Sequence, residues 1–236
     1  MIILLMFGSA IALFASVMFI NQRTTRILGT VIFGVLFVGS TALMSLNYSH
    51  HFGMHQVTRT TTQKVYSAAG NLPVAIYQPV GTNGRDDVLI YKTSQDQKKP
   101  QHTQANEYTT SKMKFTNRSN AVLKTTETRW RFKNNFYKSL YLWSGMDSTL
   151  VKRTNVIEYP KVYVKVTTAQ AKQLQKTTSS NAGQMQSQMK AYVSAQVQAA
   201  MAKNPKMSAQ QIQQVSQQAE QKLMAQMIRT NIKSVQ

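Results

Sequence analysis

The sequence predicts a membrane-anchored α+β protein: an N-terminal transmembrane helical hairpin, an antiparallel β-meander curled into a sandwich or small barrel, and a C-terminal helical hairpin. Three observations predict this fold class. Two long apolar stretches open the chain, runs of β-branched and aromatic residues fill its middle, and Ala, Gln, Met and Lys dominate its end. We divide the 236 residues into the transmembrane hairpin with its loop at 21–26, a juxtamembrane stalk, the β domain and a Gln- and Met-rich helical hairpin: 1–46, 47–63, 64–176 and 177–236.

The two apolar stretches are each long enough to cross a bilayer. Residues 1–20 contain no charged side chain, and residues 27–46 repeat this pattern. At 1.5 Å per residue, each gives the ~30 Å that a bilayer core requires. The first stretch lacks the basic region that begins a cleaved signal peptide, so we expect both helices to be retained. Small residues that permit close helix packing recur in both: Gly8, Ala12, Ser16, Gly29, Gly34 and Gly39.

The loop between these stretches predicts their orientation. It carries Arg23 and Arg26, whereas the segment after Leu46 has no Lys or Arg until Arg59. Short loops rich in Lys and Arg face the cytoplasm. We therefore expect a two-pass protein of the plasma membrane, with both termini and the main domain on the outer side. The strong positive charge of that domain is the one observation favouring the opposite orientation.

The middle of the chain reads as consecutive strands joined by turns. A hairpin is expected from Val74–Gln78 and Val88–Thr93, which flank the turn-forming Gly81–Gly84. The absence of a helical period between strands predicts the antiparallel meander. Further strands are expected at Glu107–Phe115, Ala121–Lys133, Phe136–Trp143, Leu150–Tyr159 and Val162–Thr167.

Two of these strands, Ala121–Lys133 and Val162–Thr167 with the residue before it, carry the candidate binding surface. With a period of two, Trp130 and Phe132 point to one face of their strand and the neighbouring basic residues to the other. If the two strands share a sheet, its solvent face is a basic, partly aromatic surface for polyanions. An ordinary sheet with one solvated face is the alternative. The candidate residues are Arg129, Arg131, Lys133, Lys161, Tyr163 and Lys165. Glu127 is the expected ion-pair partner of Arg129.

Helix-forming composition begins after Thr168. Apolar residues from Met185 to Met201 recur every three to four positions, and the pattern ends at Asn204-Pro205. Ser208 with Gln211 predicts a capping box at the start of a second helix. We expect a linker at Thr177–Gly183. The helices could pack on the β domain, pair with another copy or bind a partner, and packing on the β domain is the first expectation.

The sequence offers little catalytic equipment. It has no cysteine, which excludes thiol catalysis and cysteine-ligated metals. His50, His51 and His55 form a cluster without a nearby carboxylate, so an interfacial turn is favoured over a metal site. The Ser144–Ser148 loop lacks the strand, turn and helix of a nucleophile elbow, and no phosphate-binding loop occurs. We expect no catalytic residues, no cofactor and no metal.

Three segments carry a resemblance to a known family. They are Gln101–Thr110, Thr125–Arg131 and the stretch from Ser144–Asp147 through Val151–Asn155. On these segments the chain resembles a family of small, double-spanning membrane proteins of lactic-acid-type Gram-positive bacteria, catalogued as a domain of unknown function. The likeness covers the anchor and the β domain to about Lys176. It implies a membrane setting and no activity.

Charge narrows the expected role. The chain has 28 Lys and Arg against 8 Asp and Glu, and since only Arg23 and Arg26 precede Arg59, the soluble part has a net charge of +18. So basic a domain attracts anionic polymers or lipid surfaces, although the charge could also serve only solubility. We expect a non-enzymatic extracytoplasmic domain that binds an anionic envelope component, such as a wall polymer or lipid headgroups, or a membrane protein partner.

Two alternatives belong to other functional classes. One is an accessory factor of a membrane complex that acts, or self-associates, through the C-terminal helices. The other is a hydrolase of cell-wall polymers, which is disfavoured because acid-base pairs are scarce. Nucleic acid is not an expected partner unless the orientation is reversed.

Overall fold

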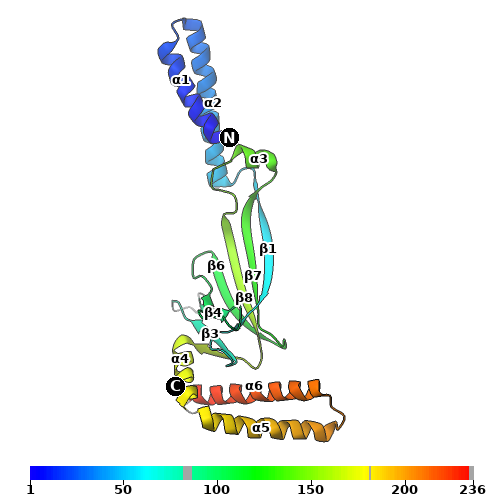
Figure 1. The fold of residues 1–236 in the computed structure, drawn as a ribbon. Coiled ribbons are helices and arrows are strands. Elements are labelled where there is room, and N and C mark those ends of the chain that lie inside the picture. The colour runs from blue at the N-terminus through cyan, green and yellow to red at the C-terminus, as the bar shows by residue number, and fades with distance from the viewer. Residues whose placement is uncertain (82–86, 181, 234–236) are drawn as a thin grey trace. The chain divides into compact units, whose positions relative to one another are not determined.

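The computed structural model describes residues 1–81, 87–180 and 182–233 (Figure 1). The chain divides into two compact units. The first consists of Met1–Arg59 with Glu127–Arg153, and the second of Thr60–Thr126 with Thr154–Gln236.

Two apolar helices begin the first unit: α1 (Ile2–Phe19) and α2 (Arg23–His50). Both are long and apolar enough to cross a membrane, and they lie side by side (Figure 1). The predicted loop at 21–26 is too long, because Arg23 and Arg26 already belong to the first turn of α2. The predicted close packing is confirmed where the helices meet: a Cβ atom on Gly29 would lie 2.9 Å from Ser16 Oγ. Gly8 and Gly39 have open space around them instead.

The predicted stalk at 47–63 is replaced by regular structure. Helix α2 continues to His50, and His51 ends it in the left-handed conformation with a φ of 54°. Strand β1 (Met54–Lys64) follows after Gly53. The sequence Met-His-Gln-Val-Thr-Arg-Thr-Thr-Thr-Gln-Lys is rich in β-branched residues, which favour an extended chain. The stalk prediction gave this composition too little weight.

A four-stranded sheet has the order β1-β7-β8-β6, with β6 (Thr109–Thr116), β7 (Val122–Phe132) and β8 (Leu150–Pro160). Of the neighbouring pairs in this order only β7 and β8 follow one another in the chain, so the predicted meander is wrong here. The predicted strand Phe136–Trp143 is also wrong, because residues 135–140 form helix α3 (Asn135–Leu140). The Asn134 side chain accepts a hydrogen bond from the Tyr137 backbone N–H at 3.1 Å, which starts a helix despite the aromatic residues.

A second sheet lies entirely in the second unit. Its order is β2-β4-β3-β9, and β5 pairs with β4. Its strands are β2 (Tyr66–Ser67), β3 (Val74–Gln78), β4 (Val88–Lys92), β5 (Gln101–His102) and β9 (Val164–Thr167). The predicted β3–β4 hairpin is confirmed, with Ile76 opposite Ile90. Of its predicted turn, residues 82–84 lie outside the described residues. Strand β9 pairs in parallel with β3, so the all-antiparallel prediction is wrong.

The sheets are mixed rather than wholly antiparallel, and in the described part of the chain the strand order closes no barrel. Parallel pairing requires a long crossover between the partner strands, because a short turn cannot reverse the direction twice. Here the chain between β3 and β9 includes β4 to β8. No local sequence signal marks such a pair.

Helices α4 (Thr168–Ser180), α5 (Ala182–Lys203) and α6 (Ala209–Lys233) complete the second unit. The linker predicted at 177–183 is largely helical, since α4 runs to Ser180. Helices α5 and α6 form the predicted hairpin. Its capping box is confirmed: Ser208 N donates to Gln211 Oε1 at 2.8 Å, and Gln211 N donates to Ser208 Oγ at 3.3 Å.

Two apolar clusters hold the second unit together. The first contains Leu89, Leu123 and Ile157, together with Tyr159, all at most 3% exposed. The second joins the sheet of β3 and β9 to the C-terminal helices, since it contains residues of β3, β9, α4 and α6: Val74, Ile76, Val164, Val166, Ala171, Leu174, Ala225 and Ile228. Packing of the C-terminal helices on the β domain is therefore confirmed for α6.

Candidate functional site

An ionic cluster on β7 and β8 forms the core of the candidate site. Glu127 accepts hydrogen bonds from two guanidinium groups: Arg129 Nε at 2.7 Å and Arg153 Nε at 2.6 Å. Arg129 Nη1 also donates to the carbonyl oxygen of Ser148 at 2.8 Å. The predicted Glu127–Arg129 pair is thus confirmed, and one carboxylate holds two arginines in place. Charge-assisted bonds of this kind fix side-chain geometry.

The next residue on the same face of β7 is more exposed. Arg131 Nη1 lies 3.2 Å from Asp147 Oδ2, with 45% and 38% of the two side chains exposed. Asp147 belongs to the Ser144–Ser148 loop, which closes against β7 through a hydrogen bond from Ser148 N to Trp130 O at 2.9 Å. Ion pairs this exposed are weak, so Arg131 can exchange its partner for an external anion at little cost.

Lys133 continues the row just beyond β7. Its backbone N–H donates to Gly53 O at 2.9 Å, and its side chain is exposed. Among the described residues, it takes part in none of the six ion pairs. Alternate positions on a strand are about 7 Å apart, so Arg131 and Lys133 present two neighbouring charges to solvent. We call Glu127, Arg129, Arg131, Lys133 and Arg153 the arginine cluster.

The other half of the predicted surface lies elsewhere. Lys161, Tyr163 and Lys165 belong to the second unit, and β9, which contains Lys165, is part of the other sheet. The premise that β7 and β9 share one sheet is therefore wrong. The parallel pairing of β9 with β3 is the physical reason.

These three residues also differ from one another. Lys165 Nζ lies 4.1 Å from the centre of the Tyr77 ring and 3.5 Å from Asp87 Oδ2, so its charge already has two partners. Tyr163 was expected on the solvent side but packs against the first core cluster, at 5.2 Å from the Tyr159 ring, and burial raises the pKa of its hydroxyl. Of these three residues, only Lys161 is both exposed and in none of the ion pairs that the described part of the chain contains.

Sequence reasoning missed Arg153 and Asp147 as members of this site. Arg153 lies 26 residues from Glu127, on a strand whose partner was not identified. The signal that was available is chain order, because sequential strands are usually neighbours in a sheet. The strand predicted at Leu150–Tyr159 follows β7 directly once Phe136–Trp143 is recognised as non-strand.

One histidine of the cluster after α2, His51, has a structural role. The ring of His51 is stacked on that of Trp130, with centroids 4.0 Å apart and an interplanar angle of 15°. Within the described ranges, no group of three or more His, Asp or Glu residues is placed to hold a metal ion. His51 therefore serves to close the end of α2 onto β7.

An apolar groove of about 680 Å³ runs between α5 and α6. Half of the residues that line it are aliphatic or methionine, among them Leu72, Met189, Val193, Val197, Ile212 and Met224, and the other half are polar or charged. Methionine-rich surfaces adapt to varied partners. The alternative role of these helices, binding a partner protein, stays a prediction.

The ion pairs of the arginine cluster depend on the ionised carboxylate of Glu127, so their contribution to stability depends on pH. The hydrogen bond from Arg129 lowers the pKa of Glu127, burial opposes this shift, and the hydrogen bond from Arg153 adds to it. Because the pKa is lower in the folded protein, the ion pairs contribute stability above the unfolded-state pKa of about 4.3. This contribution disappears as the pH falls through the folded-state pKa.

We predict that Glu127→Gln lowers the free energy of unfolding by about 1 kcal/mol at pH 7 and by less at an acidic pH, because protonation of wild-type Glu127 removes the same ion pairs as the pH falls through its folded-state pKa. Urea unfolding of the full chain in detergent micelles measures both values. Asp96→Asn is the control, because Asp96 is exposed and, among the described residues, in no ion pair. A loss of equal size at both pH values would contradict the prediction.

Comparison with known proteins identifies one relationship. The sequence model of a protein family described as a domain of unknown function (DUF4811) matches residues 21–174. The matched region runs from the loop before α2 into α4. No curated protein and no solved structure matches the chain.

Proposed function

The chain belongs to the DUF4811 family of domains of unknown function, and on that premise we propose that it is a two-pass protein of the plasma membrane whose basic soluble part faces outward and binds an anionic polymer of the envelope. One observation carries the proposal. A soluble part with a net charge of +18 follows two helices that are apolar enough to cross a membrane. The helices keep this charge at the membrane surface, where phosphate-bearing polymers are its natural ligands.

The orientation rests on the distribution of Lys and Arg near the ends of the helices. Arg23 and Arg26 lie in the first turn of α2, at the connection to α1. At the other end of α2, no basic residue follows until Arg59. The connection therefore belongs on the cytoplasmic side, and the soluble part on the opposite side.

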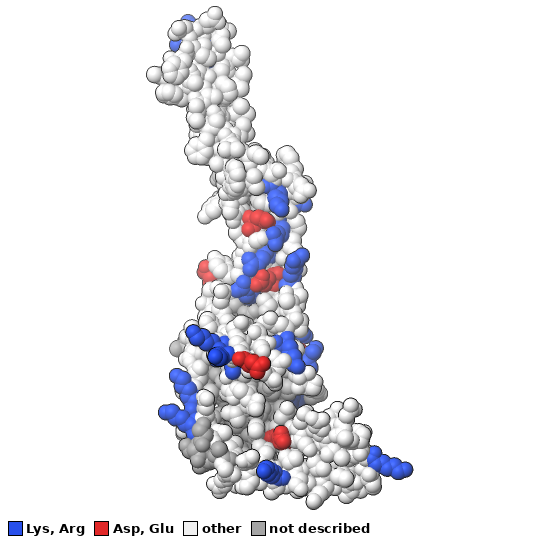
Figure 2. All heavy atoms as spheres, viewed as in Figure 1, with Lys and Arg blue, Asp and Glu red and all other residues white. Residues whose placement is uncertain are grey.

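The excess of basic side chains supports polyanion binding. The six ion pairs of the described residues engage six cations, a small share of the 28 Lys and Arg in the sequence. Figure 2 shows that Lys and Arg outnumber Asp and Glu on the face in view. A long anionic chain can bind many such groups at once, and each contact releases counterions.

The arginine cluster is the strongest candidate for the first contact. Glu127 holds Arg129 and Arg153 with 32% and 20% of their side chains exposed, so both guanidinium groups are fixed in place at the surface. Beside them, Arg131 and Lys133 are exposed. Guanidinium groups bind phosphate through two parallel hydrogen bonds, which favours a phosphodiester polymer over a sugar polymer without charge.

The proposal predicts salt-dependent binding of polyglycerol phosphate. The full chain, reconstituted in discs of zwitterionic lipid, should bind the fluorescently labelled polymer with a logarithm of affinity that falls linearly with the logarithm of salt concentration. We predict that Arg131→Gln with Lys133→Gln weakens binding and reduces the magnitude of this slope by about 1 to 2, since two phosphate contacts are lost.

A matched control separates a local site from a general field. Lys98→Gln with Lys99→Gln removes the same charge from an exposed loop of the second unit and should leave the slope nearly unchanged. Equal effects of the two double variants would show that charge acts without a site at the arginine cluster. Binding that does not change with salt, or no binding, would contradict the proposed function itself.

A further inference from the structure

Exposed aromatic side chains gather in the first unit. Among the described residues beyond position 46, the three most exposed large hydrophobic side chains are Tyr48 at 71%, Trp143 at 68% and Phe136 at 66%. Tyr48 lies near the end of α2, Phe136 lies on α3, and Trp143 follows α3. Large exposed apolar side chains in one region usually mark a contact surface.

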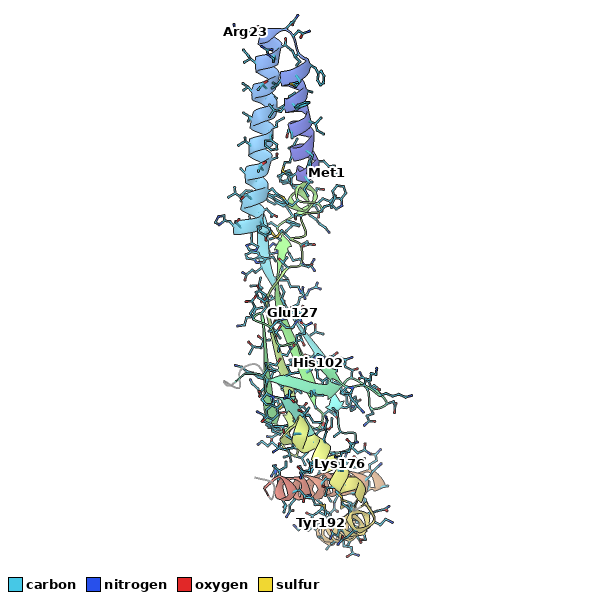
Figure 3. The ribbon with its side chains drawn as sticks, turned by 90° about the vertical axis from the view of Figure 1, so that its left-hand side faces the viewer. Met1, Arg23, His102, Glu127, Lys176 and Tyr192 are labelled. Atoms are coloured by element: carbon cyan, nitrogen blue, oxygen red, sulfur yellow. The ribbon has the colours of Figure 1, made fainter. Side chains whose placement is uncertain are left out.

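Helix α3 is fixed at the end of the apolar hairpin. Tyr141, which is 1% exposed, donates a hydrogen bond from its hydroxyl to the carbonyl oxygen of Leu43 on α2 at 3.2 Å. The backbone nitrogen of Met1 donates to the carbonyl oxygens of Ser139 and Leu140 at 2.9 and 3.1 Å. Figures 1 and 3 both show α3 beside Met1, and Figure 3 shows Arg23 at the opposite end of the hairpin.

This attachment sets the depth of α3 relative to the apolar helices. Leu43 lies 17 residues beyond Arg26, which corresponds to about 26 Å along the helix. A bilayer core is about 30 Å thick, so a hairpin with Arg26 at one surface brings Leu43 close to the other. Helix α3 then lies at the boundary between the acyl chains and the headgroups.

The inner side of α3 is held rigidly, while Phe136 on the outer side touches Tyr137 with one edge and stays 66% exposed. Tyr141 stacks on Phe132 at 5.9 Å and lies parallel to Tyr137 at 6.5 Å. Trp143 has a φ of 69°, a conformation that bulky residues rarely adopt, and the hydrogen bond from Ser144 N to Tyr141 O at 3.0 Å closes the turn around it. The fold therefore keeps Trp143 exposed in a fixed position.

We propose that α3 and the residues after it (135–143) form an interfacial anchor, which rests in the headgroup region of the bilayer that α1 and α2 cross. Trp and Tyr concentrate at this depth because one end of each ring is apolar and the other polar. Lys133 and Lys138 are exposed nearby in sequence and suit lipid phosphates. This inference rests on the membrane insertion of the hairpin in the proposed function.

The chain contains two tryptophans, Trp130 and Trp143, which makes the proposal directly testable. The full chain is reconstituted into phosphatidylcholine vesicles whose lipids carry bromine at shallow or deep acyl positions. The difference in emission between wild type and Trp143→Phe isolates Trp143 without changing Trp130. We expect shallow bromine to remove about half of the Trp143 emission or more, and deep bromine to remove less, because the ring lies near the headgroups.

A third variant distinguishes this proposal from the insertion of the hairpin. Phe14 lies within α1 and is 60% exposed, so Phe14→Trp, with both native tryptophans changed to Phe, places a reporter in the apolar span. Strong quenching of this reporter by deep bromine establishes insertion.

If the Phe14→Trp reporter is quenched while Trp143 is accessible to aqueous iodide, the interfacial anchor is wrong and the membrane insertion of the hairpin stands. If Trp143 is shielded from both iodide and bromine, protein covers the surface and the lipid proposal is also wrong. No quenching of the Phe14→Trp reporter would overturn membrane insertion, and the interfacial anchor with it.

Discussion

Replacing Gly53 by alanine is expected to lower the free energy of unfolding by about 3 kcal/mol or more. Gly53 connects α2 to β1 with a φ of 80°, a region that residues with a Cβ atom rarely occupy. A Cβ atom at this position would also lie well inside van der Waals contact with the Tyr137 ring. Backbone strain and overpacking therefore add together at one position. Urea unfolding in detergent micelles measures the loss.

Gly145→Ala is the matched control for this variant. Gly145 belongs to the same unit and has a similar φ of 74°, but a Cβ atom there would have no neighbour within 4 Å. Its substitution should cost about 1 kcal/mol, from backbone strain alone. Equal losses at the two positions would show that Tyr137 does not restrict the connection between α2 and β1.

Replacing Ile157 by alanine is expected to cost about 3 to 4 kcal/mol. Ile157 is completely buried on β8, within the cluster that also contains Leu89, Leu123 and Tyr159. Removing three methyl or methylene groups there loses their burial and leaves a cavity, because residues of both sheets surround the side chain in this cluster. The same urea titration reports the effect through the midpoint of the transition of the second unit.

Ile232→Ala provides the comparison with identical chemistry. Ile232 lies on α6 at the edge of the second core cluster and is only partly buried. Its truncation should cost about 1 kcal/mol, because solvent can fill the space that the side chain leaves. If the two substitutions cost the same, the cluster around Ile157 does not stabilise the second unit as its burial indicates.

The apolar helices and the capped helix α6 could be predicted because their signals are local. Uncharged stretches of about 20 residues need no partner to be recognised, and Ser208 with Gln211 forms its hydrogen bonds within one turn. The end of α2 was harder to place, because Asn47 to His50 are polar and the helix continues past the apolar span. The length of the apolar stretch therefore does not give the length of the helix that contains it.

The errors in the β region arise from competition between propensity and context. Phe136 to Trp143 has the aromatic composition of a strand, and only the Asn134 cap turns the chain into α3. The parallel pair of β3 with β9 joins segments about 90 residues apart, for which no local pattern exists. Together these two errors produced the predicted meander.

The same distinction explains the candidate site. Glu127 and Arg129 are two residues apart on one strand, so their ion pair followed from the period of a strand. Arg153 and Asp147 reach the cluster through tertiary structure, which the order of residues did not reveal. Tyr163 satisfied the alternation pattern of an outward residue, yet it packs on Tyr159 because β9 belongs to a different sheet.

The placement of the basic domain outside the cell is the claim on which the proposed function depends. The chain contains no cysteine, so single cysteines can be introduced as unique reporters. Ser119 is exposed in the turn before β7, and Thr24 is exposed at the start of α2. With a membrane-impermeant maleimide, we predict that Ser119→Cys is labelled in intact cells and Thr24→Cys only after the membrane is permeabilised. Labelling of Thr24→Cys but not Ser119→Cys in intact cells would contradict the account.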